Sequence, residues 1–364
     1  MNGVLVARPL DKGKNMGDYI QSVAQEQFWE HIDCYVEREE LDEISSKEKI
    51  NLIMNAWFML KPEHFPPSNS INPLYVSFHI AKKQAEKILS PLAIEHLKKY
   101  APIGARDFMT RDLLLNHGID SYFSGCLTIT LGETYKSATK NNIIYFVDPY
   151  YELGGVLNKK NIIKLGCKAF FALIRHWKKV KKMKNFQYEV KYSLQNAPSW
   201  LLRILRLLMC ASFYSTYSKA FSDDLLFNAE FVQHRINVEH LTTEEMRMEY
   251  ARQLIRKYAQ AQLVITSRLH CALPCLGVET PVIFVTSDAL EEGKLRTAGR
   301  FGGNMELLHQ MRWTPQGVYA VSEDLKKTMK SGKIEKSIKI ENKEDYKRLR
   351  DELIQRVREF TKNQ

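Results

Sequence analysis

The stretch TSRLH (266–270), set in QLVITSRLHCALPCLGVETPVIFV (262–285), decides the fold. A short apolar run (263–265) ends at two hydroxyl residues, small and apolar residues follow at helical spacing, and a second apolar run comes after a Gly-Val turn. This order predicts a strand, a helix and a strand. In an open α/β sheet, ligands bind beyond the carboxyl ends of the strands and near helix N-termini. We therefore expect Arg268 and His270 to lie at a binding site.

The chemistry of these side chains fits that position. A guanidinium such as that of Arg268 can donate two parallel hydrogen bonds to a carboxylate or phosphate. An imidazole such as that of His270 can transfer protons near neutral pH. The alternative is an ordinary arginine at a helix N-terminus and a histidine whose hydrogen bonds are satisfied in a core helix.

A second stretch, KNMGDYIQ (14–21), stands where a predicted first strand (4–7) leads into a helix. Gly17 lets a backbone approach a ligand, and the free N–H groups at a helix start favour an anion or a sugar hydroxyl. Asn15 and Asp18 flank this glycine. The alternative is a simple N-capped turn.

A third stretch, GARD (104–107), opens another predicted helix that ends at Gly118. The alternative for this pair is a capping Asp107 and a surface Arg106. Basic loops with glycine hinges often close on phosphate groups. The loop KLRTAGRFGG (294–303) is of this kind, unless it is a solvated surface loop, and its cations are Lys294, Arg296 and Arg300.

The stretches 14–21, 104–107 and 266–270, in this order along the chain, resemble the signatures of the polysaccharide pyruvyl transferase family. The resemblance spans residues 1 to about 310. It implies an α/β protein with two Rossmann-like domains in a GT-B-like arrangement and an active-site cleft between them. It also implies transfer of a pyruvyl group from phosphoenolpyruvate to a sugar, usually as a cyclic ketal across two hydroxyls.

That reaction assigns roles to the residues. Protonation of the enol carbon and deprotonation of a sugar hydroxyl require a general acid and a general base. We predict His270 first, with Asp107 or His234, which ends a predicted strand (230–234), as its complement. No step needs a metal or a redox cofactor, so we expect neither. The residues predicted to bind substrate are Arg268, Arg106, Lys294, Arg296, Arg300, Asn15, Gly17, Asp18 and Ser267.

The chain has 364 residues, with 45% hydrophobic and 26% charged residues, which is typical of a globular protein long enough for two α/β domains. We predict an N-terminal domain on the acceptor side (1–138) and a C-terminal domain on the donor side (139–342). A last helix (343–364) is expected to cross back to the first domain.

The six cysteines lie mostly in apolar runs without a CxxC pair, which indicates reduced, packing cysteines. The sequence contains no run of 18 apolar residues, and its first apolar stretch is too short for a signal peptide. We therefore expect a cytoplasmic protein.

The net charge of +11 is concentrated in one place. Residues 159–206 contain thirteen lysines and arginines but one acid, Glu189, whereas the rest of the chain is nearly neutral. Such concentration argues against a general nucleic-acid-binding surface. The predicted insertion (159–220) has one apolar helical face, formed by Ile162, Gly166, Ala169, Phe170, Leu173, Trp177 and Val180.

Basic amphipathic helices of this kind lie in membrane interfaces. We expect residues 159–209 to bind the anionic inner face of the membrane as a peripheral contact. The acceptor would then be a polyprenyl-diphosphate-linked precursor of a capsule or exopolysaccharide. The alternative is a helix pair packed on the domain with a solvated basic face.

Two other functions remain open at this point. The first is a GT-B glycosyltransferase that uses a nucleotide sugar, in which Arg268 and the basic loop would hold a diphosphate. The second is a non-catalytic, membrane-associated component of polysaccharide assembly.

Overall fold

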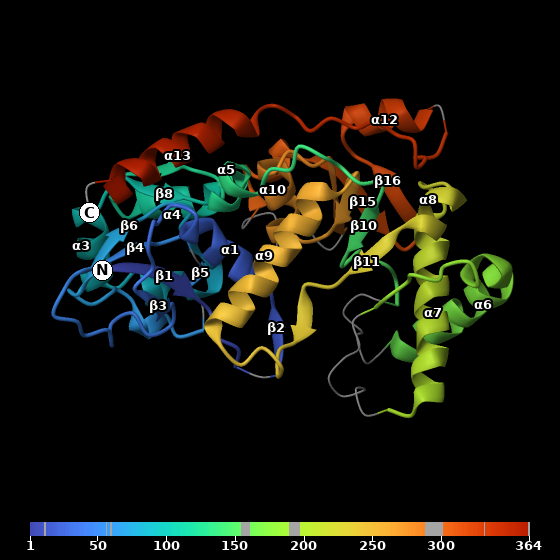
Figure 1. Cartoon of the computed structure of the whole chain (residues 1–364), viewed down its shortest axis with the longest axis horizontal. Helices are drawn as coiled ribbons and strands as arrows, with labels where there is room; N and C mark the ends of the chain where they lie inside the picture. Colours follow the sequence, from blue (N-terminus) through green and yellow to red (C-terminus); the bar gives the residue numbers. More distant parts are fainter. Residues whose placement is uncertain are drawn as a thin grey trace.

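Figure 1 shows the computed structural model, with the N-terminal half in blue and cyan and most of the C-terminal half in green to orange. Helix α13 (Tyr346–Lys362) runs along one edge of the molecule. The structure describes residues 1–10, 12–55, 57–58, 60–153, 161–188, 197–287, 301–330 and 332–362.

The N-terminal half is built on a four-stranded sheet in the order β3-β1-β4-β6, with every neighbouring pair parallel. Apolar runs form its strands, and three consecutive residues of the first strand, 4–6, are buried. Two short parallel pairs, β5-β7 and β8-β9, extend this half. The strands are β1 (Asn2–Val6), β3 (Cys34–Glu37), β4 (Ile50–Ile53), β5 (Trp57–Phe58), β6 (Ile71–Leu74), β7 (His79–Ile80), β8 (Ile103–Ala105) and β9 (Ser121–Phe123).

Helices alternate with these strands, as a parallel sheet requires. They are α1 (Gly17–Glu26), η1 (Pro62–His64), η2 (Lys82–Gln84), α2 (Ala85–Ile88), α3 (Pro91–Lys99), α4 (Phe108–Asn116), η3 (Leu127–Thr130) and α5 (Gly132–Tyr135).

The C-terminal half holds a six-stranded sheet in the order β11-β10-β13-β14-β15-β16. All neighbouring pairs are parallel except the last, in which the short β15–β16 connection makes the pair antiparallel. The strands are β10 (Ile144–Val147), β11 (Glu230–Val232), β13 (Leu263–Thr266), β14 (Val282–Ser287), β15 (His309–Thr314) and β16 (Gly317–Ala320). Its helices are α6 (Ile162–Val180), α7 (Ser199–Tyr217), α8 (Asp223–Asn228), α9 (Glu244–Gln260), α10 (Leu269–Gly277), η7 (Met305–Leu307) and α12 (Glu323–Lys330).

The strand–helix–strand prediction for 262–285 is confirmed by β13, α10 and β14. The fold is thus mixed α/β with parallel sheets, and the GT-B-like arrangement stays a prediction. The predicted boundary at residue 138 falls between α5 and β10.

Three features join the two halves. Strand β2 (Gly13–Asn15) pairs antiparallel with β12 (Arg235–Asn237). One buried apolar cluster contains residues of α1, α9, α10 and α13 together. Helix α13 packs on the N-terminal half, where Phe360 meets Trp29 with ring centroids 6.1 Å apart. The crossing-back of the last helix is therefore confirmed.

The sequence patterns of 80–99 and 122–129 favour one helix and one strand in the N-terminal half, and both predictions are wrong. The helix expected over 80–99 is broken, because Ser90 caps a new helix at Pro91 and accepts a hydrogen bond from the Ala93 N–H at 3.3 Å. The strand expected over 122–129 stops at Phe123, because Gly125 adopts a φ of 69° and the chain turns into η3.

The insertion forms two helices, α6 and α7, as expected, but the prediction that the apolar side chains of the first helix share one face is wrong. Ala169 and Val180 are buried, whereas Phe170 and Trp177 point outward, with 54% and 42% of their surface exposed. Helix α6 therefore has two apolar faces, one packed inward and one exposed. Within the described part of the chain, no helix has the length and hydropathy needed to cross a bilayer.

Candidate active site

Gly17, at the start of α1, lies where polar side chains of the two halves meet. A Cβ atom on Gly17 would lie 3.2 Å from His270 Cβ, 3.3 Å from Asn15 Oδ1 and 3.4 Å from His234 Nδ1. The absence of a side chain at Gly17 therefore allows these three residues to converge. The structure brings together four residues that the sequence predicted for the site.

The β2–β12 pairing positions this turn. The Met16 N–H donates to the His234 carbonyl at 2.8 Å, and the Gly17 N–H donates to Asn15 Oδ1 at 3.2 Å. Asn15 thus fixes the turn by its own side chain. The N-terminal motif and His234 are joined directly, although they are more than 200 residues apart in the sequence.

Asp18 lies among cations. Its Oδ2 is 3.0 Å from Lys14 Nζ, and its Oδ1 is 3.9 Å from a nitrogen of Arg38. Burial alone would raise the pKa of Asp18, but the charges of Arg38 and Lys14, with a smaller contribution from His270, lower it below the ordinary value. Asp18 is consequently ionised at neutral pH.

Arg268 is oriented by Asp148, a residue that the sequence reasoning missed. Arg268 Nε donates to Asp148 Oδ2 at 2.7 Å, and the His234 backbone N–H donates to the same oxygen at 3.3 Å. The Ser267 hydroxyl donates to the Asp148 carbonyl at 2.5 Å, which gives Ser267 a positioning contact. The available signal was weak: an acidic residue directly after the β10 strand, at the carboxyl edge of the sheet.

His234 and His270 differ in their surroundings. His234 is 1% exposed, and its Nε2 lies 2.7 Å from the Tyr258 hydroxyl. His234 Nδ1 faces Gly17 and has no hydrogen-bond partner among the described residues. His270 stands second in α10 with a non-helical backbone (φ −78°, ψ 20°) and is partly buried.

Arg106 has the most unusual environment in this site. It is 0% exposed, so the alternative of a surface arginine is wrong. None of its three guanidinium nitrogens has a hydrogen-bond partner within the described ranges, and Asp107 Oδ2 is 4.0 Å from Nε. Burial lowers the pKa of Arg106, opposed by the negative charges of Asp107 and Asp18. A buried cation without hydrogen bonds is costly, and a bound anion would offset that cost.

Asp107 is the N-cap of α4, as the alternative reading expected. Its Oδ1 accepts from the Thr110 N–H at 2.9 Å, and its Oδ2 lies 2.5 Å from His79 Nδ1. Burial would raise the pKa of Asp107, but the hydrogen bond and charge of His79 and the charge of Arg106 lower it. Both carboxylate oxygens are thus engaged, and a catalytic role for Asp107 stays a prediction. No sequence signal pointed to His79 beyond a histidine in an apolar segment.

The predicted basic loop ends beside Arg106. Lys294, Arg296 and Arg300 lie outside the described residues. The residues that follow them are placed: Asn304 Nδ2 donates to the Arg106 carbonyl at 2.8 Å, and the Phe108 N–H donates to the Gly302 carbonyl at 3.3 Å. The C-terminal end of the loop is therefore anchored on the Arg106 helix start.

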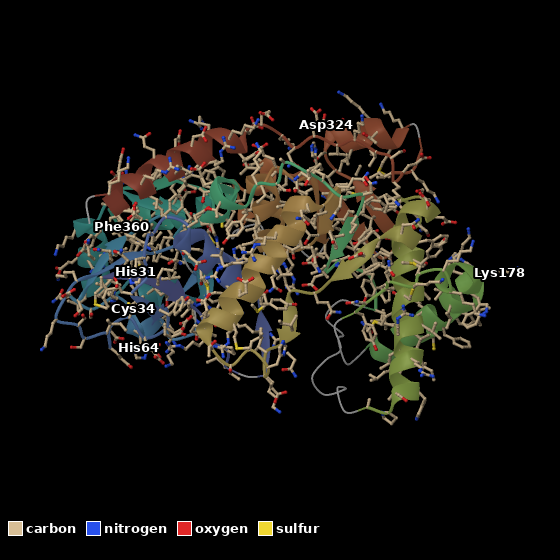
Figure 2. The ribbon with its side chains drawn as sticks, in the orientation of Figure 1. His31, Cys34, His64, Lys178, Asp324 and Phe360 are labelled. Atoms are coloured by element: carbon tan, nitrogen blue, oxygen red, sulfur yellow. The ribbon has the colours of Figure 1, made fainter. Side chains whose placement is uncertain are left out.

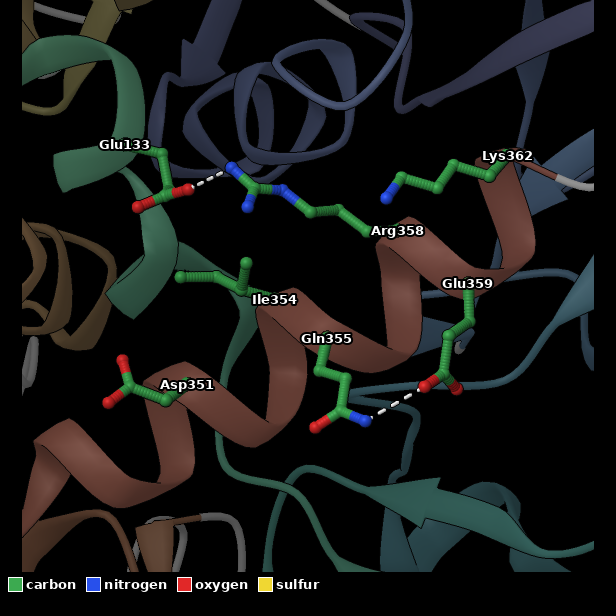
Figure 3. A pocket seen from close by; sticks show the side chains of 7 residues that line it. All are labelled: Glu133, Asp351, Ile354, Gln355, Arg358, Glu359 and Lys362. Atoms are coloured by element: carbon green, nitrogen blue, oxygen red, sulfur yellow. Dashed lines mark hydrogen bonds and ion pairs between the residues drawn. The ribbon is translucent and has the colours of Figure 1, made fainter.

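Two hollows lie on either side of α13, away from these residues. The larger one, of about 490 Å³, is lined by charged and polar side chains such as Glu133 and Arg358, which form an ion pair (Figure 3). The second, of about 290 Å³, is lined by residues such as Tyr122 and Arg356. Neither contains a candidate catalytic residue, so we do not assign the active site to them.

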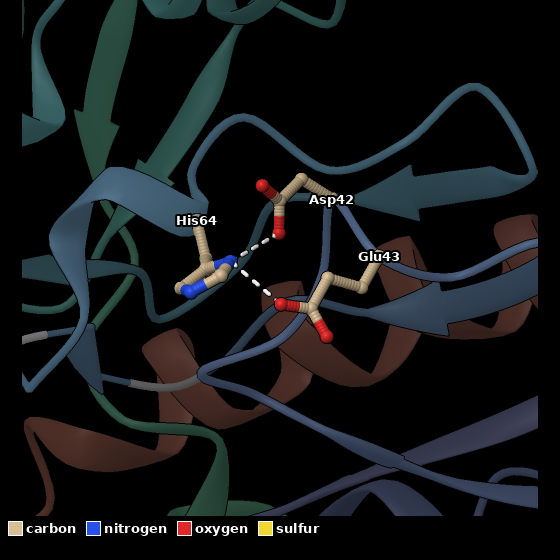
Figure 4. A group of neighbouring side chains, drawn as sticks. All are labelled: Asp42, Glu43 and His64. Atoms are coloured by element: carbon tan, nitrogen blue, oxygen red, sulfur yellow. Dashed lines mark hydrogen bonds and ion pairs between the residues drawn. The ribbon is translucent and has the colours of Figure 1, made fainter.

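One cluster in the described ranges has metal-ligand spacing, namely Asp42, Glu43 and His64 (Figure 4). A single nitrogen, His64 Nδ1, faces both acids, at 2.6 Å from Asp42 Oδ1 and 3.5 Å from Glu43 Oε1. This geometry is that of an exposed ion pair. The cluster includes none of the candidate catalytic residues.

The structure thus places a buried cation directly before α4, and two histidines beside the starts of helices α1 and α10, in an α/β protein. Residues 76–289, more than half of the chain, match the family model described as polysaccharide pyruvyl transferase. The chain belongs to this family and is a transferase. The matched span includes Arg106, His234, Arg268 and His270, whereas Asn15–Asp18 precedes it. The search of curated proteins finds no match.

Proposed function

We propose that this enzyme transfers a pyruvyl group from phosphoenolpyruvate to a sugar of a polysaccharide precursor and forms a pyruvate ketal. The observation that carries the donor assignment is the fully buried Arg106, whose guanidinium has no hydrogen-bond partner among the described residues. Phosphoenolpyruvate brings both a carboxylate and a phosphate, so it needs more than one fixed cation.

Arg106 and Arg268 are the two cations that we assign to the donor. Arg268 is held in place through Nε by Asp148 at 2.7 Å, and its side chain is 40% exposed. Lys14 and Arg38 lie nearby but are engaged with Asp18. Lys294, Arg296 and Arg300 would complete the phosphate site, since their loop is anchored beside Arg106. Because Arg106 belongs to the N-terminal half, we propose that donor contacts come from both halves across a GT-B-like cleft.

His270 and His234 are the groups that we assign to proton transfer. In the reaction, C3 of phosphoenolpyruvate gains a proton, and a sugar hydroxyl oxygen bonds to C2. The C2–O bond to phosphate then breaks, and a second hydroxyl closes the ketal. Of the two hydroxyl protons released, one is balanced by the proton on C3 and one leaves with phosphate. This sequence needs one acid and one base.

The environment suggests which histidine does what. The carboxylate of Asp18 interacts electrostatically with His270, and an imidazole beside a carboxylate suits a proton donor to C3. His234 lies against the Tyr258 hydroxyl, and the Nδ1 atom that faces Gly17 can accept a proton from a sugar hydroxyl. We propose His270 as the general acid and His234 as the general base. Asp107 is the second candidate, because Thr110 and His79 already engage both of its carboxylate oxygens.

Fewer side chains identify the acceptor than identify the donor. Asn15, Gly17 and Asp18 form the wall facing the two histidines, and backbone N–H groups at a helix start suit sugar hydroxyls. We propose a polyprenyl-diphosphate-linked sugar as the acceptor, met at the cytoplasmic face of the membrane, and no nucleic-acid partner.

Ligand-dependent thermal stability tests the proposal. Phosphoenolpyruvate should raise the melting temperature, and a nucleotide sugar should not. Stabilisation by a nucleotide sugar alone would instead favour a glycosyltransferase, and no response to either would favour a non-catalytic component. Proton NMR of the reaction with a sugar acceptor should then show the new ketal methyl group together with release of phosphate.

A further inference from the structure

Helix α6 exposes a continuous apolar stripe to solvent. Before the kink at His176, its side chains recur three, four or seven residues apart, which places them on one helical face. They are between 42% and 80% exposed: Ile163, Phe170, Phe171, Ile174 and Trp177. Trp200 and Ile204 of α7 add two more exposed apolar side chains, at 62% and 45%.

This stripe is not needed to hold the insertion on the protein. The opposite face of α6 packs inward through Ala169 and Val180, and α6 packs along α7. Helix α7 continues into the core through Phe213 and Tyr217, which are fully buried beside Phe146 of β10. The exposed stripe is therefore apolar surface beyond what folding requires, and large exposed apolar patches mark interaction sites.

Basic side chains surround the stripe. The described residues 161–188 and 197–209 contain no aspartate or glutamate. Figure 2 shows Lys178 at the outer edge of α6. Exposed basic residues of this region that have no acidic partner within the described ranges are Lys164, Arg175, Lys178, Lys181, Lys182, Lys184 and Arg203.

We propose that this surface, the α6–α7 apolar stripe with its basic rim, docks on the anionic face of a lipid bilayer. Aliphatic and aromatic side chains enter the headgroup–acyl boundary, and lysines bind anionic headgroups. This docking rests on the proposed function and deepens it, because it puts the enzyme where a lipid-linked acceptor would be. Vesicle binding can nevertheless be measured without any acceptor or pyruvyl transfer.

Other partners fit less well. A nucleic acid would use the lysines but would gain little from exposed isoleucines, because its recognition relies on phosphate contacts and base stacking. A second copy of the same surface would bring two uncompensated basic rims together, which is repulsive. A bilayer alone satisfies both the apolar stripe and the charge.

Docking would also fix the active site relative to the membrane. The chain leaves β10 at Asp148, which orients Arg268, and five residues later the Leu153 N–H donates to the Ser212 hydroxyl of α7 at 3.1 Å. Lys168 of α6 pairs with Glu152 on the same segment. The helix pair is thus attached rigidly beside the carboxyl edge of the C-terminal sheet, where the candidate residues lie.

Sedimentation with vesicles tests this inference. Wild-type protein should bind vesicles containing about 30% phosphatidylglycerol, should release as salt rises, and should bind neutral phosphatidylcholine weakly. The variant Lys164→Glu, Lys178→Glu, Lys181→Glu, Lys184→Glu should lower the partition coefficient on the order of 100-fold or more. Its matched control carries the same charge change on exposed lysines of the N-terminal half: Lys47→Glu, Lys83→Glu, Lys87→Glu, Lys98→Glu.

A second variant tests the apolar component. Phe170→Ser, Phe171→Ser, Ile174→Ser should weaken binding at high salt, whereas Leu92→Ser, Leu115→Ser, which alters exposed leucines of the N-terminal half, should not. The proposal is overturned if wild-type protein does not bind anionic vesicles, or if each stripe variant binds as well as its control. Vesicle binding by a protein that transfers no pyruvyl group would refute the proposed function alone. If the proposed function holds, the stripe variants should keep full activity on a short soluble acceptor, because that acceptor does not require the membrane.

Discussion

Replacing Arg106 with methionine separates a ligand-binding arginine from a structural one. Methionine has a similar length and no charge, so Arg106→Met removes a fully buried guanidinium that lacks a hydrogen-bond partner among the described residues. Replacing a whole buried ion pair by apolar residues is often neutral or stabilising by about 1–4 kcal/mol, whereas removing one partner is destabilising when the other charge is left without compensation. Asp107 loses one favourable charge but keeps His79 and the Thr110 N–H. We therefore expect the lower end of that range, about 1 kcal/mol, or about 2 °C in melting temperature.

The ligand response should change in the opposite direction. Removing one partner of a buried charge pair costs about 2–5 kcal/mol in binding, which is roughly 30- to 4,000-fold in affinity. Phosphoenolpyruvate at about 100 times its dissociation constant would stabilise wild-type protein by about 2.7 kcal/mol. The same concentration should stabilise Arg106→Met by at most about 0.9 kcal/mol. The variant should thus be more stable than wild type without ligand and less stable with it.

Scanning fluorimetry with and without phosphoenolpyruvate measures both effects in one experiment. Arg111→Met is the matched control in α4, the helix that follows Arg106, since Arg111 is partly exposed and pairs with Asp112. It should change the free energy of unfolding by no more than about 0.5 kcal/mol. Its stabilisation by phosphoenolpyruvate should equal that of wild type. If Arg106→Met is destabilised by about 2 kcal/mol or more and still responds to phosphoenolpyruvate as wild type does, Arg106 is structural and the donor assignment fails.

Four further changes complete the tests: three alter residues of the site, and one alters a histidine outside it. Arg268→Lys keeps the charge but loses the planar guanidinium held by Asp148, so kcat/KM should fall about 100-fold or more. His270→Ala should fold normally and lose turnover, and near-wild-type rates in either variant would remove that residue from the mechanism. Gly17→Ala places a methyl group 3.2 Å from His270 Cβ. It should change stability by less than about 1 kcal/mol but lower kcat about tenfold, because small displacements of catalytic groups are costly; unchanged kcat would show that His270 needs no such close fit. Burial and the charge of Lys99 lower the pKa of His96 to about 4. Between pH 6.5 and 4 the unfolded state therefore binds more protons at His96 than the folded state, and stability falls as the pH decreases through this window. Urea denaturation of His96→Gln should show a smaller loss of stability from pH 7 to pH 5, and an unchanged loss would contradict this assignment.

Local pattern predicted the elements that carry the site. The apolar runs around TSRLH specified β13, α10 and β14 because alternation of strand and helix is encoded within about 25 residues. The turn at Gly17 and the helix start at Arg106 were likewise visible. The failures at Ser90 and Gly125 came from short capping and turn signals that interrupted longer apolar patterns.

Long-range contacts could not be predicted in the same way. Asp148 orients Arg268 across 120 residues, and His79 meets Asp107 across 28. The burial of Arg106 runs against the ordinary preference of arginine for the surface, so no composition rule would find it. On α6, the sequence showed an amphipathic helix but did not reveal that one apolar face would remain uncovered.

The β2–β12 ribbon has a consequence for motion. It crosses between the halves within two residues of Gly17 and within one of His234. When two bodies share such a ribbon, rotation about it displaces distant parts most and the parts next to it least. The distance between the Gly17 turn and His234 should therefore stay nearly constant if the halves open, while the Arg106 helix start travels further. The ribbon would act as a pivot, so that sugar-facing groups stay assembled and the donor pocket opens and closes around them.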